Sequence, residues 1–284
     1  MKRLQLFHET EYLFSGDVML GPHKLLLRPR EGHDIRIERA TLTVSPTAVV
    51  KWHRDEYDNS VAVASFSVPT RRLSIVSEVS IAHYDEWPLD FLLEDYAVLF
   101  PFTYNNEEYQ ALAPYLQNNL HSNDGLFAAW LGRFSQRSGI QTYGLLNEIS
   151  QTIRSEHQYR VREEPGVQSV EDTLGLQSGS CRDFAWLFMY TARCLGLAAR
   201  FVSGYLHAPS TEFDYGATHA WAEIYLPGAG WKGFDPTVGE LTATHHIPAA
   251  VSIMPESVPP VSGHFTGTGG VGSTLSVRVQ VKSV

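Results

Sequence analysis

The sequence is poor in cysteine, which limits the covalent ways of holding the fold together. Only two cysteines, Cys181 and Cys194, occur among 284 residues. Both fall on one predicted helix, about 20 Å apart at a rise of about 1.5 Å per residue. A disulfide requires Cα atoms closer than about 7 Å. A disulfide framework is therefore excluded, and this composition suits a reducing compartment.

Long hydrophobic runs and an excess of positive charge are also missing. No stretch is apolar enough to cross a bilayer, and the first ten residues lack the apolar segment of a signal peptide. We therefore expect a cytoplasmic protein that does not insert into a membrane. With 31 acidic and 22 basic residues the formal net charge is −9. This charge argues against binding to nucleic acid or to an anionic membrane surface.

Patterns typical of metal and nucleotide sites are absent as well. The pair His245-His246 and the scattered acidic residues lack metal-ligand spacing, so no metal is predicted. The glycines at 267–272 lack the preceding strand and following helix of a phosphate-binding loop. No cofactor is therefore predicted.

The chain is long enough, and at 43% hydrophobic residues apolar enough, for two domains. From Leu4 to about Ala82 the apolar residues alternate, as at Ile35/Ile37 and Leu42/Val44, and an aromatic-rich stretch over residues 95–117 is expected to link the domains. This period of two predicts an antiparallel β-sandwich over residues 1–110. Alternation returns in the tail, so residues 266–284 are expected to form a final strand that can rejoin the sandwich.

Residues 111–265 have a different pattern, with helices followed by strands. Apolar spacings of three and four predict helices near 126–136, 143–153 and 169–176, and a further helix that begins at Cys181. Strands are expected at 199–206, 220–226 and 230–235, the last two joined as a hairpin. The prediction is an α+β core in which a helix bearing cysteine packs on an antiparallel sheet.

Three residues of this core have complementary chemistry. Ser180 fits a helix N-cap with Asp183 as the reciprocal carboxylate, which places Cys181 in the first turn, where free N–H groups favour a thiolate. His219 then fits a general base, and Asp235 fits the residue that orients the imidazole. Taken singly, each residue also fits a purely structural role: Cys181 as a buried apolar side chain, His219 as a hydrogen-bonded histidine, and Asp235 as part of an Asp-Pro-Thr turn. Their order along a helix and two strands favours a catalytic triad.

The surroundings of the triad can be predicted only in outline. An oxyanion site would use the backbone N–H of Cys181, and the side-chain amide of Gln177 is a candidate second donor, although a surface role is more usual for a loop glutamine. Trp221 and Trp231 flank the histidine and the aspartate and are candidates for walls of the acyl site. Buried tryptophans on strands are more often part of the core.

Three segments carry a family resemblance: Gly179-Ser-Cys-Arg-Asp-Phe-Ala185, Leu195-Gly-Leu-Ala-Ala-Arg-Phe-Val-Ser-Gly204, and His219-Ala-Trp-Ala-Glu followed by Phe234-Asp-Pro-Thr237. Together they resemble the bacterial transglutaminase-like superfamily. The front half, with His8-Glu-Thr-Glu-Tyr12 and Leu27-Arg-Pro29, resembles the N-terminal β-domain of that group. The resemblance implies a papain-like core with Cys181, His219 and Asp235 as nucleophile, base and orienting residue.

The resemblance also implies a reaction on a peptide or protein substrate through an acyl-enzyme thioester. Water would complete the hydrolysis of a peptide or isopeptide amide, whereas an amine would complete a glutamine acyl transfer. A third alternative is a binding module that retains the triad without catalysis. Trp186 and Val251-Ser-Ile-Met depart from the pattern of many relatives, which carry histidine and Gly-Arg-Asp-Tyr there. These departures affect the expected substrate contacts and leave the triad unchanged.

Overall fold

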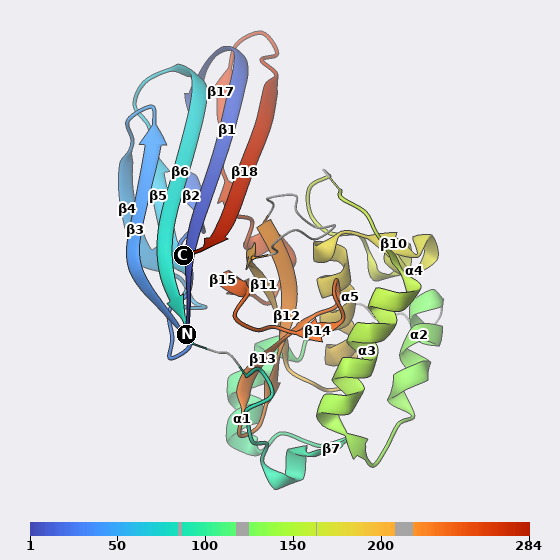
Figure 1. The fold of residues 1–284 in the computed structure, drawn as a ribbon. Coiled ribbons are helices and arrows are strands. Elements are labelled where there is room, and N and C mark those ends of the chain that lie inside the picture. Colours follow the sequence, from blue (N-terminus) through green and yellow to red (C-terminus); the bar gives the residue numbers. More distant parts are fainter. Residues whose placement is uncertain (85–86, 118–124, 163, 208–217) are drawn as a thin grey trace.

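The computed structural model describes residues 1–84, 87–117, 125–162, 164–207 and 218–284. They form a β-sandwich and a core in which helices cover one sheet (Figure 1). The N- and C-termini both lie in the sandwich, on the adjacent strands β1 (Lys2–Leu20) and β18 (Ser273–Ser283). Within these residues, no helix combines the length and the apolar character needed to cross a membrane.

The sandwich consists of two antiparallel sheets. The first contains β1, β18, β3 (Ile35–Ser45), β6 (Thr70–His83) and β17 (Phe265–Gly267). The second contains β2 (His23–Leu25), β4 (Val49–Arg54), β5 (Ser60–Ser65) and β16 (Val261–Ser262). Alternate residues of β1, among them Leu4 and Leu6, are buried, as the period of two predicted. Apolar side chains of both sheets, such as Leu25 and Ile75, fill the space between them.

The chain returns to the sandwich earlier than the sequence indicates. β16 pairs with β2, and β17 pairs with the end of β1, so both belong to the sandwich although residues up to 265 were assigned to the core. β18 pairs with the first part of β1 over Leu4 to Phe14. The last residues of the chain, in β17 and β18, therefore pair with β1 in the first sheet of the sandwich.

The stretch between sandwich and core contains regular structure. It includes η1 (Asp95–Ala97), β7 (Leu99–Phe100), α1 (Asn106–Leu112) and η2 (Ala113–Tyr115). Asn105 and Glu108 cap α1 reciprocally, each side chain bonded to the other's N–H. β7 pairs with β8 (Ile140–Gln141), which ties this stretch to the core.

The core contains an antiparallel sheet with the strand order β14-β13-β12-β11-β15. These strands are β11 (Ala199–Leu206), β12 (Thr218–Leu226), β13 (Gly230–Asp235), β14 (Glu240–Leu241) and β15 (His246–Ser252). The helices are α2 (Leu126–Ser135), α3 (Thr142–Glu156), α4 (Val170–Leu176), α5 (Cys181–Cys194) and the short η3 (Pro255–Ser257). β9 (Gln158–Tyr159) and β10 (Ser178–Gly179) pair in parallel.

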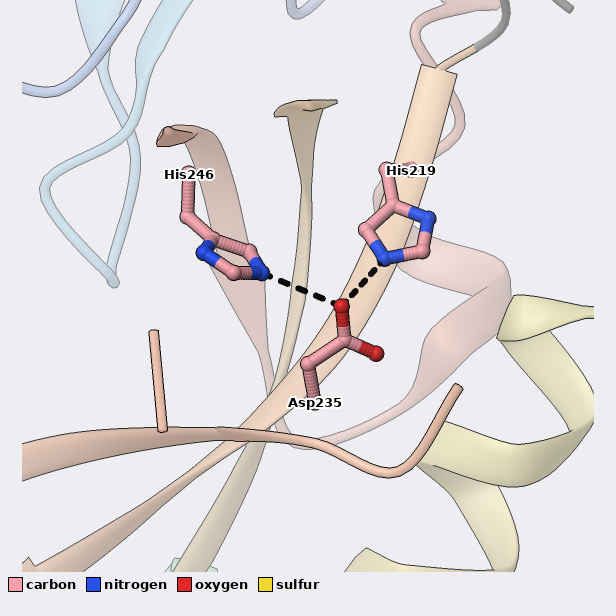
Figure 2. A group of neighbouring side chains, drawn as sticks. All are labelled: His219, Asp235 and His246. Carbon is pink, nitrogen blue, oxygen red and sulfur yellow. Dashed lines mark hydrogen bonds and ion pairs between the residues drawn. The ribbon is translucent and has the colours of Figure 1, made fainter. Parts of the chain in front are cut away.

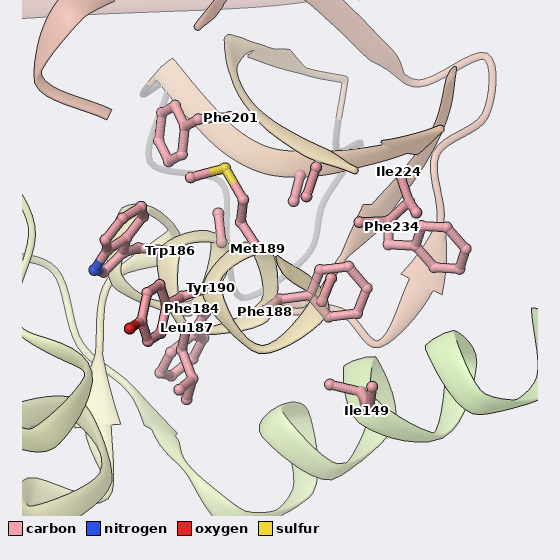
Figure 3. Close-up of a cluster of buried hydrophobic side chains, with 14 of the residues drawn as sticks. Ile149, Phe184, Trp186, Leu187, Phe188, Met189, Tyr190, Phe201, Ile224 and Phe234 are labelled. Carbon is pink, nitrogen blue, oxygen red and sulfur yellow. The ribbon is translucent and has the colours of Figure 1, made fainter. Parts of the chain in front are cut away.

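Helix α5 is the centre of the core and is buried along nearly all of its length. Its side chains pack on the sheet on one side and on α3 on the other (Figure 3). Phe188 stacks on Phe234 of β13 with ring centroids 5.5 Å apart, and Ile149 of α3 joins the same cluster. A helix that begins at the cysteine and packs on an antiparallel sheet is the predicted α+β arrangement, which is confirmed.

The other face of the sheet meets the sandwich. Tyr205 of β11 and Ile247 of β15 belong to one buried cluster with Leu4 and Ile81 of the sandwich. Polar contacts add to this interface, since the buried Asn59 side chain exchanges two hydrogen bonds of 2.8 Å with the backbone of Val251. The core sheet is therefore held between the sandwich and the helices.

Candidate active site

The sulfur of Cys181 lies at the start of α5, where a buried carboxylate fixes the helix terminus. Asp183 accepts hydrogen bonds from the Ser180 N–H at 2.7 Å and the Ser180 hydroxyl at 2.8 Å. Cys181 is the first residue of α5, a position at which a backbone N–H has no acceptor within the helix. Cys181 is 8% exposed. The positive end of the α5 dipole would stabilise a negative charge on the slightly exposed Cys181 sulfur.

The same carboxylate holds the segment that precedes α4 against the start of α5. The second oxygen of Asp183 accepts from the Gln168 N–H and from Nη1 of Arg162, both at 2.7 Å. Arg182 adds a bond of 3.2 Å from Nη2 to the carbonyl of Arg162. Asp183 therefore has a role beyond helix capping, because it ties a long connection to the turn that carries Cys181.

His219 and Asp235 come together because β12 and β13 pair. The register places Ala222 opposite Phe234, so Asp235 at the end of β13 lies near the first residues of β12. His219 Nε2 and Asp235 Oδ2 are 2.6 Å apart. Asp235 is fully buried and His219 is 9% exposed. The Cys181 side chain also contributes to raising the pKa of His219, so the three residues predicted as a triad lie near one another.

Asp235 accepts a further hydrogen bond from a residue that the sequence argument did not include. His246 Nε2 on β15 lies 3.0 Å from the same oxygen, Oδ2 (Figure 2). Oδ1 accepts from the N–H of Thr237 at 2.9 Å. Three donors therefore surround a carboxylate with no exposed surface, which satisfies a charge that would otherwise be costly to bury.

The charges of this pair follow from competition between burial and hydrogen bonding. Burial disfavours the imidazolium, but the charge and hydrogen bond of Asp235, with the hydrogen bond to Cys181, raise the pKa of His219 to about 10. Burial also disfavours the carboxylate, yet the charge and hydrogen bonds of His219, followed by those of His246, hold the pKa of Asp235 far below its usual range. At neutral pH the pair is therefore an imidazolium and a carboxylate.

His219, Asp235 and His246 place three potential metal-ligand atoms within 4.8 Å of one another. The hydrogen bonds of His246 favour a different role. Its Nδ1 accepts a bond of 3.2 Å from the N–H of Ala243, so Nε2 carries the proton in the neutral ring. A metal ligand needs a lone pair on Nε2, and this would place an N–H at Nδ1 against the Ala243 N–H. The donor set fits a hydrogen-bonded carboxylate better than a metal.

Trp221 lies close to the triad. It is 1% exposed, with ring centroids 6.2 Å from His219 and 5.3 Å from His246. Its ring supports the imidazoles from within the core. Gly204 makes room for it, because a Cβ at that position would lie 2.6 Å from the indole and 2.3 Å from the carbonyl oxygen of Ile247.

The other two candidate residues of the site are placed differently. Trp231 is the second residue of β13 and lies four residues before Asp235, or roughly 13 Å along an extended strand. Its ring packs on Tyr115 and Arg200, so the expected wall beside the triad is not formed by Trp231. Gln177 directly follows α4 and has an exposed side chain and a left-handed backbone conformation, and its carbonyl accepts from the Gln158 N–H.

Tyr159 is a second residue that the sequence argument missed. Burial raises the pKa of its hydroxyl, and the charges of Cys181 and Asp235 raise it further, which places the ring in the electrostatic field of the site. β9 carries it to the turn before α5 by pairing Tyr159 with Gly179. This two-residue parallel pairing has no period that a sequence pattern could reveal.

The fold and the site define an α+β protein in which a helix bearing a cysteine packs on an antiparallel sheet bearing a histidine and an aspartate. Residues 135–236 match the model of the transglutaminase-like superfamily, and residues 4–82 match the bacterial transglutaminase-like N-terminal region. The two matches together span more than half of the chain. The chain therefore belongs to the transglutaminase-like superfamily, as the resemblance predicted.

Relatives of similar length occur in mycobacteria. Uncharacterized proteins of Mycobacterium tuberculosis and Mycobacterium bovis are 27% identical over 302 residues, which cover 98% of this chain and 92% of each relative. An uncharacterized protein of Mycobacterium leprae is 32% identical over 126 residues, 41% of this chain and 43% of that one.

A solved structure has the same overall fold. The crystal structure of a "putative cysteine protease" from Cytophaga hutchinsonii superposes with a TM-score of 0.74 at 17% sequence identity. The superposition covers 100% of this chain and 91% of that one. At this identity the likeness concerns the fold, including the association of a β-sandwich with a core of this type.

Proposed function

We propose that the chain is a thiol-dependent hydrolase of peptide or isopeptide amides. The observation that carries this proposal is the buried His219–Asp235 pair, 2.6 Å between Nε2 and Oδ2, with Cys181 at the start of α5 near enough to contribute to the raised pKa of His219. The fold shared with a protein described as a "putative cysteine protease" supports it. The partner it implies is a peptide or protein substrate.

In the first half of the proposed reaction the Cys181 thiolate attacks the carbonyl carbon of the amide. A C–S bond forms, the carbonyl electrons move to oxygen, and the Cys181 N–H at the helix start donates to that oxyanion. His219 Nε2–H stays on Asp235 (Figure 2), which leaves Nδ1–H as the proton that the imidazolium can donate in the proposed reaction. The oxyanion electrons then re-form the C=O bond, the C–N bond breaks as the leaving nitrogen takes the Nδ1 proton, and a thioester remains.

In the second half a water molecule attacks the thioester carbonyl while His219 takes up its proton. The C–S bond breaks, a carboxylic acid is released and the thiolate–imidazolium pair is restored. If an amine attacks in place of water, the product is a new amide, which is the acyl-transfer alternative. The protein residues have the same roles in both reactions, so the choice depends on which nucleophile reaches the thioester.

A peptide mixture incubated with the protein tests this proposal directly. The mixture should include glutamine-containing and lysine-branched isopeptides, with and without an added biotinylated primary amine, and mass spectrometry should record the products. New termini that appear without amine indicate hydrolysis, and incorporated biotin indicates acyl transfer. Cys181→Ala should abolish either product, whereas the matched variant Cys194→Ala, at the other end of α5, should retain it.

Absence of both products, together with ordinary reactivity of Cys181, would overturn the proposal in favour of a binding module. Retention of product in Cys181→Ala would overturn the assignment of the nucleophile. Folding of each variant is checked by circular dichroism, so that loss of structure is not mistaken for loss of chemistry.

A further inference from the structure

The reaction described above makes no use of His246, although this residue contacts the centre of the site. Its ring is 2% exposed and its Nε2 lies 3.0 Å from Asp235 Oδ2, the oxygen that also binds His219. Asp235 therefore lies between two imidazoles that come from different strands, β12 and β15 (Figure 2).

The bonds of His246 identify it as a neutral donor. Burial lowers its pKa, and the hydrogen bond and charge of Asp235 oppose this only in part. The ring is therefore neutral at pH 7, and the Ala243 N–H at Nδ1 fixes its proton on Nε2. A neutral N–H donor holds the carboxylate without placing a second positive charge beside His219.

This donor limits rotation of the carboxylate of Asp235. The N–H of Thr237, in the turn after β13, donates to Oδ1, and Nε2 of His246, the first residue of β15, donates to Oδ2. Without His246, Oδ2 would have only the imidazole of His219 to hold it, and these two side chains would be free to turn together. The direction in which His219 presents Nδ1 to Cys181 depends on this contact.

The sandwich in turn holds His246. The backbone carbonyl of His246 accepts a hydrogen bond of 3.2 Å from Nε2 of His83, the last residue of β6. The next residue, Ile247, is fully buried in the cluster that joins the sheet to Leu4 and Ile81 of the sandwich. The strand carrying His246 is therefore fixed by the sandwich on one side while the ring of His246 contacts the triad.

We propose that His246 is a positioning residue that fixes Asp235 for catalysis and links the triad to the sandwich. Its role in turnover rests on the proposed function, whereas its contact with Asp235 can be measured independently. This positioning role requires only that the Nε2–H of His246 donates a hydrogen bond to the Asp235 carboxylate.

The first test uses the wild-type protein with ¹⁵N-labelled histidine. Long-range ¹H–¹⁵N NMR spectra at pH 7 distinguish the two neutral tautomers, and the signals of His246 are assigned by their absence in His246→Gln. We expect the Nε2–H tautomer for His246 and a strongly downfield Nε2 proton for His219. An Nδ1–H tautomer or a charged ring at His246 would overturn the proposal whether or not the protein is an enzyme.

The second test compares three variants in Cys181 alkylation and in turnover. His246→Phe keeps an aromatic ring but removes the hydrogen-bond donor. We expect the rates of Cys181 alkylation and of turnover to fall by up to about 100-fold, and the NMR signal of the His219 Nε2 proton to shift. His246→Gln retains an N–H donor and should recover most of this loss. His245→Gln is the matched control, because its ring packs on His246 at 4.5 Å without a bond to Asp235.

Equal rates and an unshifted His219 proton in His246→Phe would show that His246 only fills space. Equal losses in the Phe and Gln variants would also contradict the donor role. If the parent protein has neither turnover nor an activated thiol, the proposed function fails, and the His219 signal still decides whether His246 positions Asp235. If His246→Phe does not fold, the tautomer measurement and His246→Gln decide.

Discussion

Replacement of Asp235 by asparagine removes the charge at the centre of the buried site and leaves its shape almost unchanged. Oδ2 accepts from His219 and His246, and Oδ1 accepts from the Thr237 N–H. An asparagine in this place offers one acceptor oxygen and one NH₂ donor. Either orientation directs the NH₂ group at an N–H donor, because the Ala243 N–H prevents His246 from changing tautomer.

The expected cost follows from these unsatisfied contacts. A buried donor without an acceptor costs about 1–3 kcal/mol, and the loss of one partner of a buried ion pair costs about 3–5 kcal/mol. The two figures describe overlapping contacts and do not add. We expect Asp235→Asn to lower the free energy of unfolding by about 3–5 kcal/mol at pH 7.

Urea titration followed by circular dichroism measures this quantity. Asp17→Asn is the matched control, because Asp17 pairs with Arg71 at the surface, where their side chains are 64% and 68% exposed. A surface pair of this kind contributes less than about 1 kcal/mol. A loss below about 1 kcal/mol in Asp235→Asn, equal to that of the control, would refute the reasoning.

Three further changes test other contacts. Folding raises the pKa of His219 from its ordinary value of 6.5 to about 10, so its contribution to stability is complete below pH 6.5 and is lost as the pH rises to about 10. The difference in unfolding free energy between wild type and His219→Gln should be larger at pH 6 than at pH 10. Gly204→Ala should destabilise by about 1–3 kcal/mol, seen as a lower melting temperature, because its methyl group would meet the Ile247 carbonyl. Asn59→Ala should cost about 1–3 kcal/mol in urea by leaving the Val251 N–H and carbonyl unpaired.

Each of these has an outcome that counts against it. A pH-independent difference for His219→Gln would mean that the imidazole is not paired in the folded state. Gly132→Ala is the control for Gly204→Ala, since no atom lies within 4 Å of its added methyl group, and it should raise stability by up to about 1 kcal/mol. A neutral Asn59→Ala would show that the sandwich and the core do not depend on this contact.

Much of the fold is predictable because its signals are local. The alternation of β1 and the three- and four-residue spacing of α3 appear within each element. Cys181 is recognisable because Ser180 and Asp183 mark the helix start beside it. The α1 helix was missed because its seven residues, between prolines and aromatics, carry only two turns of periodicity.

The site is less predictable where it depends on pairing between distant strands. His246 approaches Asp235 because β15 pairs with β11 across the sheet, with Leu206 opposite His246. The dipeptide His245-His246 does not reveal which ring points inward. Trp231 shows the converse, that closeness in sequence does not ensure contact. It lies only four residues before Asp235, but the extended strand β13 separates the two in space.

The central claim is that Cys181 and His219 form an activated pair. The most direct measurement is the rate of iodoacetamide alkylation at Cys181 and Cys194 against pH, read separately by peptide mass spectrometry in wild type and His219→Ala. The account predicts fast labelling of Cys181 below pH 7 that is lost in the variant, because the imidazolium stabilises a thiolate. Labelling of Cys181 that rises with pH as an ordinary thiol does, unchanged in His219→Ala, would contradict it.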